Sequence, residues 1–191
     1  MTFMINRNFN RRLFVVDNFY ASPHEVRDFA LKCEFKADIR WYKGLRSTQI
    51  HHPPGIRHAF EDIIGQPIDF CHEGVNGCFQ ITTSEDQQVY HFDQQKWAAM
   101  IYLSPNAPIE SGTRTHMSKV NGARHMLDGS SITDVAFAGG FYDSTKFETI
   151  DSIGYIFNRL VIMDAQHIHS AGSYFGSSPT TGRLTHLFFF N

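Results

Sequence analysis

The feature that most constrains the fold of this sequence is a change of period at about residue 77. Beyond it, apolar and polar residues alternate in short runs, and residues typical of turns separate the runs. Seven runs are expected to be strands, over residues 77–83, 88–92, 97–104, 112–118, 158–164, 166–172 and 183–191. Many short strands of this kind favour a β-sandwich or a jelly roll.

The N-terminal part has a different pattern. Residues 13–20 predict a first strand, and helices are then expected over 22–35 and 56–65. Each helix has one apolar face that could pack against a sheet. The expected fold class is therefore mainly β with helical additions, an α+β arrangement.

Capping residues support both helices. Ser22 is expected to be an N-cap, with Pro23 at the first helical position and Glu25 closing a capping box. Gly65 is a plausible stop for the second helix, because glycine readily adopts the left-handed conformation that ends many helices. These signals set the expected helix boundaries.

Length and composition predict a single domain. With 191 residues and 42% hydrophobic content, the chain can bury one core over 1–191. Residues 1–76 would supply the N-terminal strand and helices, and 77–191 the β core. The segment 118–148 is rich in Gly, Ser and Asp and has no clean period, which suggests a long mobile connection. We therefore expect a lid over about residues 105–150.

Charge and cysteine content limit the function. The formal net charge of −2, with scattered Lys and Arg, predicts no nucleic-acid partner. No run of 18 apolar residues or signal-peptide core is present, so we expect a cytoplasmic protein without a membrane partner. Cys33, Cys71 and Cys78 match no metal or redox motif and are expected to be reduced packing residues. The oligomeric state stays open.

A candidate metal site begins in "VYHFDQQKW", residues 89–97. On a strand, His91 and Asp93 would project to the same side and could hold one ion, although alone they could be a surface hydrogen-bonded pair. His169 completes the two-histidine, one-carboxylate set associated with non-haem Fe(II) oxygenases, which leaves one face of the metal open. His167, two positions earlier, is the alternative third ligand.

A candidate co-substrate site lies near the C-terminus. Arg183 can grip the distal carboxylate of 2-oxoglutarate through two parallel hydrogen bonds. Thr185 shares its strand face and can donate to the same carboxylate, while Leu187 and Phe189 continue that face as an apolar wall. The alternative for Arg183 is a solvated surface charge.

The order of these motifs resembles the Fe(II)/2-oxoglutarate-dependent oxygenase superfamily, including its prolyl-hydroxylase-like branch. The resemblance rests on "HFD", "AAMIYLS", "ESGT", "NRLVIMDAQHIHSAG" and "GRLT", and covers roughly residues 77–191. It implies a double-stranded β-helix (jelly roll) with the N-terminal helices packed on one sheet. It also implies iron on His91, Asp93 and His169, 2-oxoglutarate on Arg183, and Tyr102 on the same distal carboxylate. Tyr102 could equally be a packing residue of the core.

The resemblance implies a dioxygenase that hydroxylates a C–H bond of a small-molecule or peptidyl substrate and releases succinate and CO2. Because Asp93 is present, hydroxylation is favoured over halogenation. One alternative is a cupin-like metal-binding or isomerase jelly roll that does not use 2-oxoglutarate. Another is a non-catalytic structural jelly roll.

Other polar residues are expected to be less informative. His51 and His52 are interpreted as surface or substrate-rim residues of a loop. A second group flanks the expected lid and is interpreted as a solvated loop: Arg114, His116, Arg124 and His125.

Overall fold

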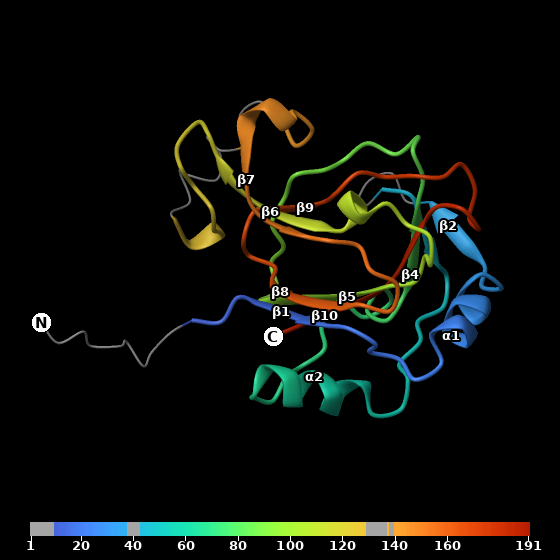
Figure 1. Ribbon diagram of the computed structural model, residues 1–191. Helices are drawn as coiled ribbons and strands as arrows, with labels where there is room; N and C mark the ends of the chain where they lie inside the picture. The colour runs from blue at the N-terminus through green and yellow to red at the C-terminus, as the bar shows by residue number, and fades with distance from the viewer. Residues whose placement is uncertain (1–9, 38–42, 129–136, 138–139) are drawn as a thin grey trace, which may run out of the picture.

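A computed structural model describes residues 10–37, 43–128, 137 and 140–191. Two antiparallel sheets dominate it, stacked one above the other (Figure 1). The larger sheet has the order β1-β8-β5-β10-β4-β3-β2, and the smaller has the order β7-β6-β9. The strands are β1 (Leu13–Val16), β2 (Phe35–Ala37), β3 (Leu45–Ser47), β4 (Phe79–Thr82), β5 (Trp97–Tyr102), β6 (Thr113–Ser118), β7 (Phe147–Ile153), β8 (Leu160–Asp164), β9 (His169–Ala171) and β10 (Arg183–Phe190). This mostly β arrangement is compatible with a jelly roll.

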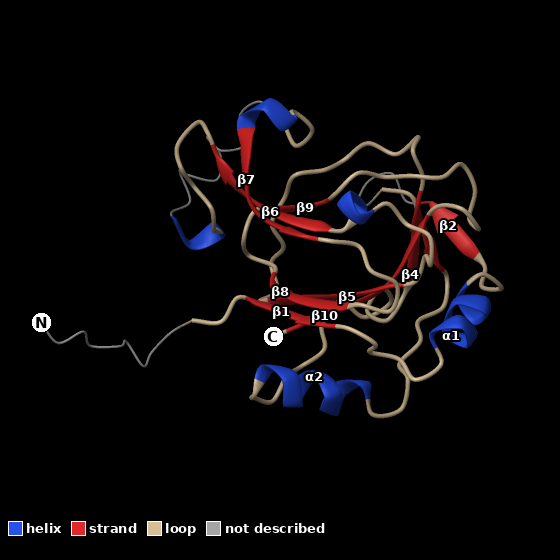
Figure 2. Cartoon of the chain, viewed as in Figure 1, coloured by secondary structure: helices blue, strands red, loops and turns tan. Residues whose placement is uncertain are grey.

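Two α-helices accompany the larger sheet (Figure 2). Helix α1 (Pro23–Ala30) lies at one end of the sheet, and α2 (Ile56–Ile64) lies under the face turned away from the smaller sheet (Figure 1). Short 3-10 turns are η1 (Ile109–Ser111), η2 (Met126–Asp128) and η3 (Ser144–Lys146). Of the described helices, none has the length and apolar character needed to cross a membrane.

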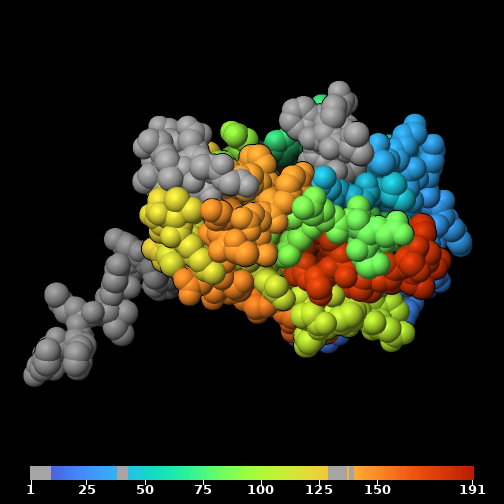
Figure 3. Space-filling model, turned by 90° about the horizontal axis from the view of Figure 1, so that it is seen from above, coloured from blue at the N-terminus to red at the C-terminus, as the bar shows by residue number. Residues whose placement is uncertain are grey.

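The larger sheet separates two apolar clusters. The cluster on its helix side includes Ala30, Ile56, Phe60, Phe79, Ile81, Trp97, Ala99, Ile101, Leu160, Ile162, Leu184, Phe188 and Phe190. The cluster on the other face includes Ala98, Met100, Tyr102, Ile153, Tyr155, Val161, Met163 and Leu187. Both faces are buried, because α2 covers one and the smaller sheet covers the other. In Figure 3, seen from above, β7 (orange) lies at the surface.

Strand β10 carries this alternation to the candidate site. It pairs with β4 on one side and β5 on the other, so its backbone is held along both edges. Leu184 and Phe188 pack with the helix-side cluster, whereas Leu187 packs with the opposite cluster. Arg183 therefore lies on the face between the two sheets, as its odd position in the strand predicted.

Most expected elements are present. Both α-helices form, but α1 ends at Ala30 instead of residue 35, and Phe35 begins β2. Gly65 ends α2 in the left-handed conformation with φ +83°. The expected capping box does not form, because the Ser22 side chain makes no capping hydrogen bond. Strands β2 and β3 were missed because three residues carry no readable period. Strand β7 was missed because most of its residues are exposed, which removes the alternation.

The prediction of a strand over residues 88–92 is wrong. Its backbone turns from one partner to another: Tyr90 N donates to Phe141 O, His91 pairs with His169, and Asp93 N donates to Ala165 O. A continuous ladder with one neighbour cannot form under these conditions. The segment crosses from one sheet to the other and carries His91 and Asp93 between them.

Candidate metal centre and active site

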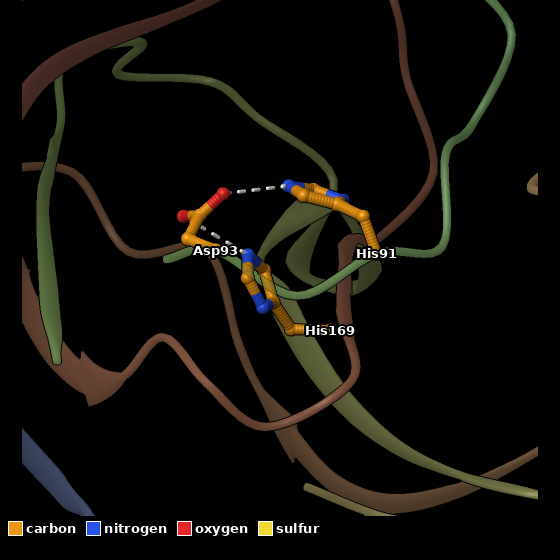
Figure 4. Close-up of side chains that lie close together, drawn as sticks. All are labelled: His91, Asp93 and His169. Carbon is orange, nitrogen blue, oxygen red and sulfur yellow. Dashed lines mark ion pairs between the residues drawn. The ribbon is translucent and has the colours of Figure 1, made fainter. Parts of the chain in front are cut away.

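His91, Asp93 and His169 converge in the space between the sheets (Figure 4). His91 Nε2 lies 3.7 Å from Asp93 Oδ1, and His169 Nε2 lies 3.8 Å from Asp93 Oδ2. Ligand atoms of the three residues all lie within 4.8 Å of one another. Nitrogen and oxygen ligands sit about 2.0–2.2 Å from a transition metal, so two ligands of one ion are about 3–4 Å apart. The two separations from Asp93 are in this range, so Asp93 can share one ion with either histidine.

The tautomer of His169 suits metal binding. Its Nδ1 lies 2.8 Å from the carbonyl oxygen of His167, which can only accept, so Nδ1 carries the proton and Nε2 offers a lone pair. Burial, together with the nearby His91, lowers the pKa of His169 to about 4, against the opposing effect of Asp93. At neutral pH the imidazole is uncharged, as a ligand must be.

Asp93 is held by a buried glutamine. Gln95 Nε2 donates to Asp93 Oδ2 at 2.9 Å, and Gln95 Oε1 is 2.8 Å from His72 Nε2. Burial alone would raise the pKa of the Asp93 carboxyl, but His169, His91 and the Gln95 hydrogen bond outweigh it, and the pKa is lowered. Asp93 is thus a carboxylate with a fixed orientation.

His167, the alternative third ligand, belongs to a different cluster. It lies beside His125 and Asp164, with the His125 and His167 ring centroids 4.8 Å apart. His125 Nε2 is 3.5 Å from Asp164 Oδ1, while its Nδ1 accepts the backbone N–H of Leu127 at 3.1 Å. That acceptor role leaves the proton of a neutral His125 on Nε2, which then faces Asp164 and offers no lone pair. The arrangement suits a hydrogen bond better than a metal ion.

The metal-ligand candidates open onto a cavity of about 340 Å³. Arg183 lies in its wall together with His91, Asp93 and His169. The guanidinium is buried, with Nε donating to Ser111 O at 2.8 Å and Nη2 to Gly112 O at 3.3 Å. It lies 5.5 Å from the ring centre of Tyr102 and 5.6 Å from that of Tyr155. Arg183 is therefore not a solvated surface charge, which was the alternative interpretation. These contacts fix the position of its guanidinium.

Two buried hydroxyls flank Arg183. Thr82 is its cross-strand neighbour on β4 and lines the cavity, and Thr185 follows it on the same face of β10. Among the residues that the structure describes, neither Oγ1 has a hydrogen-bond partner. An orphaned buried hydroxyl costs about 1–3 kcal/mol, so these two donors suit a bound group that can accept from them. Thr82 and the guanidinium, which both line the cavity, fit a carboxylate, whereas Thr185 does not line it.

Tyr102 is fully buried, and its hydroxyl is 2.7 Å from Thr113 Oγ1. Its ring stacks on Tyr155 at 4.2 Å between centroids. Burial raises the pKa of Tyr102 to about 12. In this geometry the phenol supports Arg183 through its ring, and its role toward a carboxylate remains a prediction.

Several site residues escaped the sequence analysis. Gln95 follows an identical residue in "DQQKW", and nothing in the sequence distinguishes the two. Thr82 is an ordinary strand threonine until β4 is paired with β10. Lys43, Arg46 and Tyr174 also line the cavity but come from segments far away in sequence. Only the tertiary structure brings these residues together.

The other singled-out residues have diverse surroundings. His116 was expected in a solvated loop, which is wrong: it is buried on β6, with Nε2 2.8 Å from Ser170 Oγ. His125 is half-buried beside Asp164, also contrary to expectation, whereas Arg124 is exposed. His51 and His52 lie against Phe79 and Phe70 on the helix side of the larger sheet, so the substrate-rim interpretation does not hold.

All three cysteines are free. Cys78 is buried in the cluster between the sheets, and Cys33 packs against the helix-side cluster. Burial raises the pKa of the Cys33, Cys71 and Cys78 thiols. The prediction of reduced packing residues is in accord with these surroundings.

The two stacked antiparallel sheets, with His91, Asp93 and His169 between them, have a fold similar to that of HygX from Streptomyces hygroscopicus, whose structure was solved with nickel and 2-oxoglutarate bound. The chain belongs to DUF6445, a family of unknown function whose model matches residues 4–190. A sequence comparison with the curated proteins found no match.

Solved structures share this fold at low sequence identity. HygX from Streptomyces hygroscopicus, with nickel, 2-oxoglutarate and hygromycin B bound, is 11% identical, with a TM-score of 0.59 over 94% of this chain and 82% of HygX. AviO1 from Streptomyces viridochromogenes Tue57 is 10% identical, with a TM-score of 0.51 over 93% and 89% of the two chains.

Proposed function

We propose that the protein is a non-haem Fe(II)- and 2-oxoglutarate-dependent dioxygenase that hydroxylates a C–H bond. In the balanced reaction, 2-oxoglutarate, O2 and R–H give succinate, CO2 and R–OH. The observation that carries the proposal is one cavity whose wall contains both the His91, Asp93 and His169 cluster and the buried Arg183. A metal site without a co-substrate would not need a buried, oriented guanidinium beside it.

In this proposal His91, Asp93 and His169 hold the iron, and their three ligand atoms leave the remaining positions open. Bound Fe(II), with 2-oxoglutarate and O2, supplies the oxidation of the C–H bond. The chain supplies geometry: Gln95 fixes the carboxylate of Asp93, and the His167 carbonyl fixes the ring of His169. These contacts would hold the two side chains in position for a metal ion.

Arg183 would receive the distal carboxylate of 2-oxoglutarate, with Thr82 donating its orphaned hydroxyl. The stacked rings of Tyr102 and Tyr155 would orient the guanidinium from one side. Because this end of the cavity is buried, water competes weakly for the carboxylate and the charge-assisted hydrogen bonds are strengthened. Tyr102 as a direct ligand of the carboxylate stays part of the proposal.

The same proposal extends to the architecture. The two sheets would be the halves of a double-stranded β-helix, in one domain over residues 1–191. Residues of the expected lid, about 105–150, include β6 and part of β7, so any mobile part would be shorter than that range. A cavity of about 340 Å³ is small for a ligand pocket, which favours a small molecule or one side chain of a peptide as substrate.

The test is anaerobic addition of Fe(II) and then 2-oxoglutarate, followed by absorption spectroscopy for the weak metal-to-ligand charge-transfer band. We expect the band in the wild type and its loss in Asp93→Ala, with circular dichroism unchanged because the site is not structural. Succinate formation on admitting O2 is the second readout. Iron binding without a band would favour the cupin-like alternative, and failure to bind iron would favour the non-catalytic one.

A further inference from the structure

The side-chain amide of Gln95 is held at both of its polar ends. Its Nε2 donates to Asp93 Oδ2 at 2.9 Å, and its Oε1 lies 2.8 Å from His72 Nε2. Gln95 is buried, whereas His72 is exposed. A buried amide needs a partner for its oxygen as well as for its nitrogen. Of the side chains that the structure describes, His72 is the partner of Oε1.

The chemistry of the two partners fixes the direction of both hydrogen bonds. The Asp93 carboxylate can only accept, so it requires the Nε2 end of the Gln95 amide. The Oε1 end can also only accept, so His72 must carry a proton on its Nε2. If the amide were reversed, its oxygen would face Asp93 and two acceptors would meet. The donor on His72 therefore favours the one orientation of Gln95 that Asp93 can use.

The loop that carries His72 is bonded to the end of β10. Cys71 N donates to Phe189 O at 3.0 Å. The buried Asn76 donates through Nδ2 to Cys71 O at 3.0 Å and to Phe189 O at 2.7 Å. The ring of His72 also meets the ring of Phe189 edge-on, with 5.8 Å between the centroids. These contacts locate the loop and the imidazole together.

The backbone of His72 is in the left-handed region, with φ +59°. Residues other than glycine adopt this conformation only where the surrounding contacts enforce it, and such residues are frequent near functional sites. Here the carbonyl oxygen of His72 accepts from Val75 N and from Asn76 N, both at 3.1 Å. The resulting turn directs the imidazole toward Gln95.

The hydrogen bond from Gln95 distinguishes the two oxygens of Asp93. Oδ2 accepts this bond, while Oδ1 faces His91 Nε2 at 3.7 Å (Figure 4). A hydrogen bond to one oxygen of a carboxylate fixes the rotation of the whole group, which is how outer partners orient metal-binding carboxylates. Holding Oδ2 therefore keeps Oδ1 turned toward His91.

We propose that His72 is a positioning residue of the metal centre. It holds Gln95 Oε1, and Gln95 thereby holds the carboxylate of Asp93 in the orientation that a metal ion requires. The inference rests on the proposed function, because it takes Asp93 as a metal ligand. The hydrogen-bonded chain runs from an exposed loop to the candidate metal centre, and each of its steps is a single contact.

The first test observes the Gln95 amide in metal-free protein by proton–nitrogen NMR. Its side-chain signals are those that Gln95→Ala lacks. In His72→Leu we expect hydrogen exchange of this amide to be at least about tenfold faster than in the wild type, because the freed side chain can turn to water. His72→Gln should keep the slow exchange, since its own amide can donate to Oε1. Equal exchange in the wild type and His72→Leu would overturn the inference.

The second test is titration with Co(II), whose absorption bands report the arrangement of nitrogen and oxygen ligands. His72→Leu should lower the Co(II) affinity by about threefold to tenfold and change the bands, and His72→Gln should restore both. His24→Leu is the matched control, because His24 is also exposed and its ring lies 4.8 Å from that of Phe157. An equal loss in the control, or no recovery in His72→Gln, would overturn the inference.

Two further variants separate the side chain from the loop. Asparagine tolerates the left-handed conformation but has a shorter side chain, so His72→Asn should keep the loop and still lose the contact with Gln95. It should bind Co(II) as weakly as His72→Leu does. Adding His72→Leu to Gln95→Ala should cause no further loss of affinity, because His72 acts through Gln95. Additive losses would overturn the inference.

The wild-type protein separates this inference from the proposed function. If it does not bind Co(II), or if Asp93→Ala binds Co(II) equally well, the proposed metal site fails and the inference fails with it. If binding depends on Asp93 but His72→Leu and His72→Asn bind as the wild type does, the inference alone fails. Weaker binding in both variants, with recovery in His72→Gln, supports it.

Discussion

His91 and His169 are joined by a pair of backbone hydrogen bonds in which each residue donates to the other. His91 N lies 3.0 Å from His169 O, and His169 N lies 2.7 Å from His91 O. The pair is an isolated antiparallel bridge, and the ring centroids are 4.3 Å apart. The backbone therefore sets the separation of these two candidate ligands without help from a metal.

Comparing His169→Ala with His167→Ala tests which histidine is the third ligand. We expect His169→Ala to lower Fe(II) affinity by more than about 100-fold, since a ligand has a larger effect than the groups that support it. His167→Ala should leave the affinity within about threefold, because the imidazole of His167 points to His125 while its carbonyl, which orients His169, is retained. Metal content after gel filtration gives the measurement. Loss of iron in the His167 variant alone would contradict the assignment.

Gln95→Ala tests the support of Asp93. The change removes the donor that holds Asp93 Oδ2 and should lower metal affinity by about 10- to 100-fold. Gln94→Ala is the matched control, because Gln94 is the exposed neighbour of the same residue type. A competitive titration with a metal-responsive dye measures both. Equal affinities in the two variants would show that Asp93 needs no such support.

The strands that form the cavity could be predicted because one face of each packs on an apolar cluster. In β10 the alternation placed Arg183 and Thr185 on one face and Leu184 and Phe188 on the other, and the structure has this arrangement. The exposed β7 and the three-residue β2 and β3 lack such a signal. Alternation thus identifies the interior of the sheets better than their edges.

The candidate site was only partly predictable for a related reason. His91 and Asp93 were expected on one strand face, but they converge because their segment crosses between sheets and bonds to Phe141, His169 and Ala165 in turn. Thr82 becomes a neighbour of Arg183 only through the pairing of β4 with β10. Sequence spacing cannot supply such cross-strand neighbours, because a one-residue slip in register would replace every one of them.

Substitution of Arg183 tests the co-substrate site. Arg183→Leu should leave iron bound but lower the affinity for 2-oxoglutarate by about 30- to several-thousand-fold, because truncating a buried charge pair costs about 2 to 5 kcal/mol. Arg183→Lys should be milder, because the charge is kept without the planar fork. The measurement is the 2-oxoglutarate dependence of succinate formation at saturating Fe(II). Circular dichroism is needed because Arg183 also bonds to Ser111 O and Gly112 O. An unchanged dependence in Arg183→Leu would place the distal carboxylate elsewhere.

His186 is a fully buried histidine on the helix side of β10, away from the metal-ligand candidates. Its Nδ1 accepts a hydrogen bond from the Tyr20 hydroxyl at 2.8 Å. Its Nε2 donates hydrogen bonds to His51 O at 3.0 Å and Gly77 O at 3.1 Å. Burial lowers the pKa of His186 to about 3, although the bonds to Gly77 and His51 oppose the shift. The folded protein therefore holds this imidazole neutral well below the usual pKa of histidine.

This shift predicts acid sensitivity of the fold. In the unfolded chain His186 has a pKa of about 6.5, so between about pH 6.5 and about pH 3 the unfolded state binds the extra proton. The contribution of His186 to the free energy of unfolding should therefore be fully present above about pH 6.5. Below that pH the free energy of unfolding should fall by up to about 1.4 kcal/mol per pH unit.

The variant His186→Gln cannot titrate at this position, so its free energy of unfolding should depend less steeply on pH, by about that amount. It should also be about 1–3 kcal/mol less stable at neutral pH, because its hydrogen bonds are altered. Urea unfolding at several pH values measures both, and His58→Gln, which replaces an exposed histidine of α2, is the control. If His186→Gln keeps the wild-type slope, protonation of His186 does not limit stability in acid.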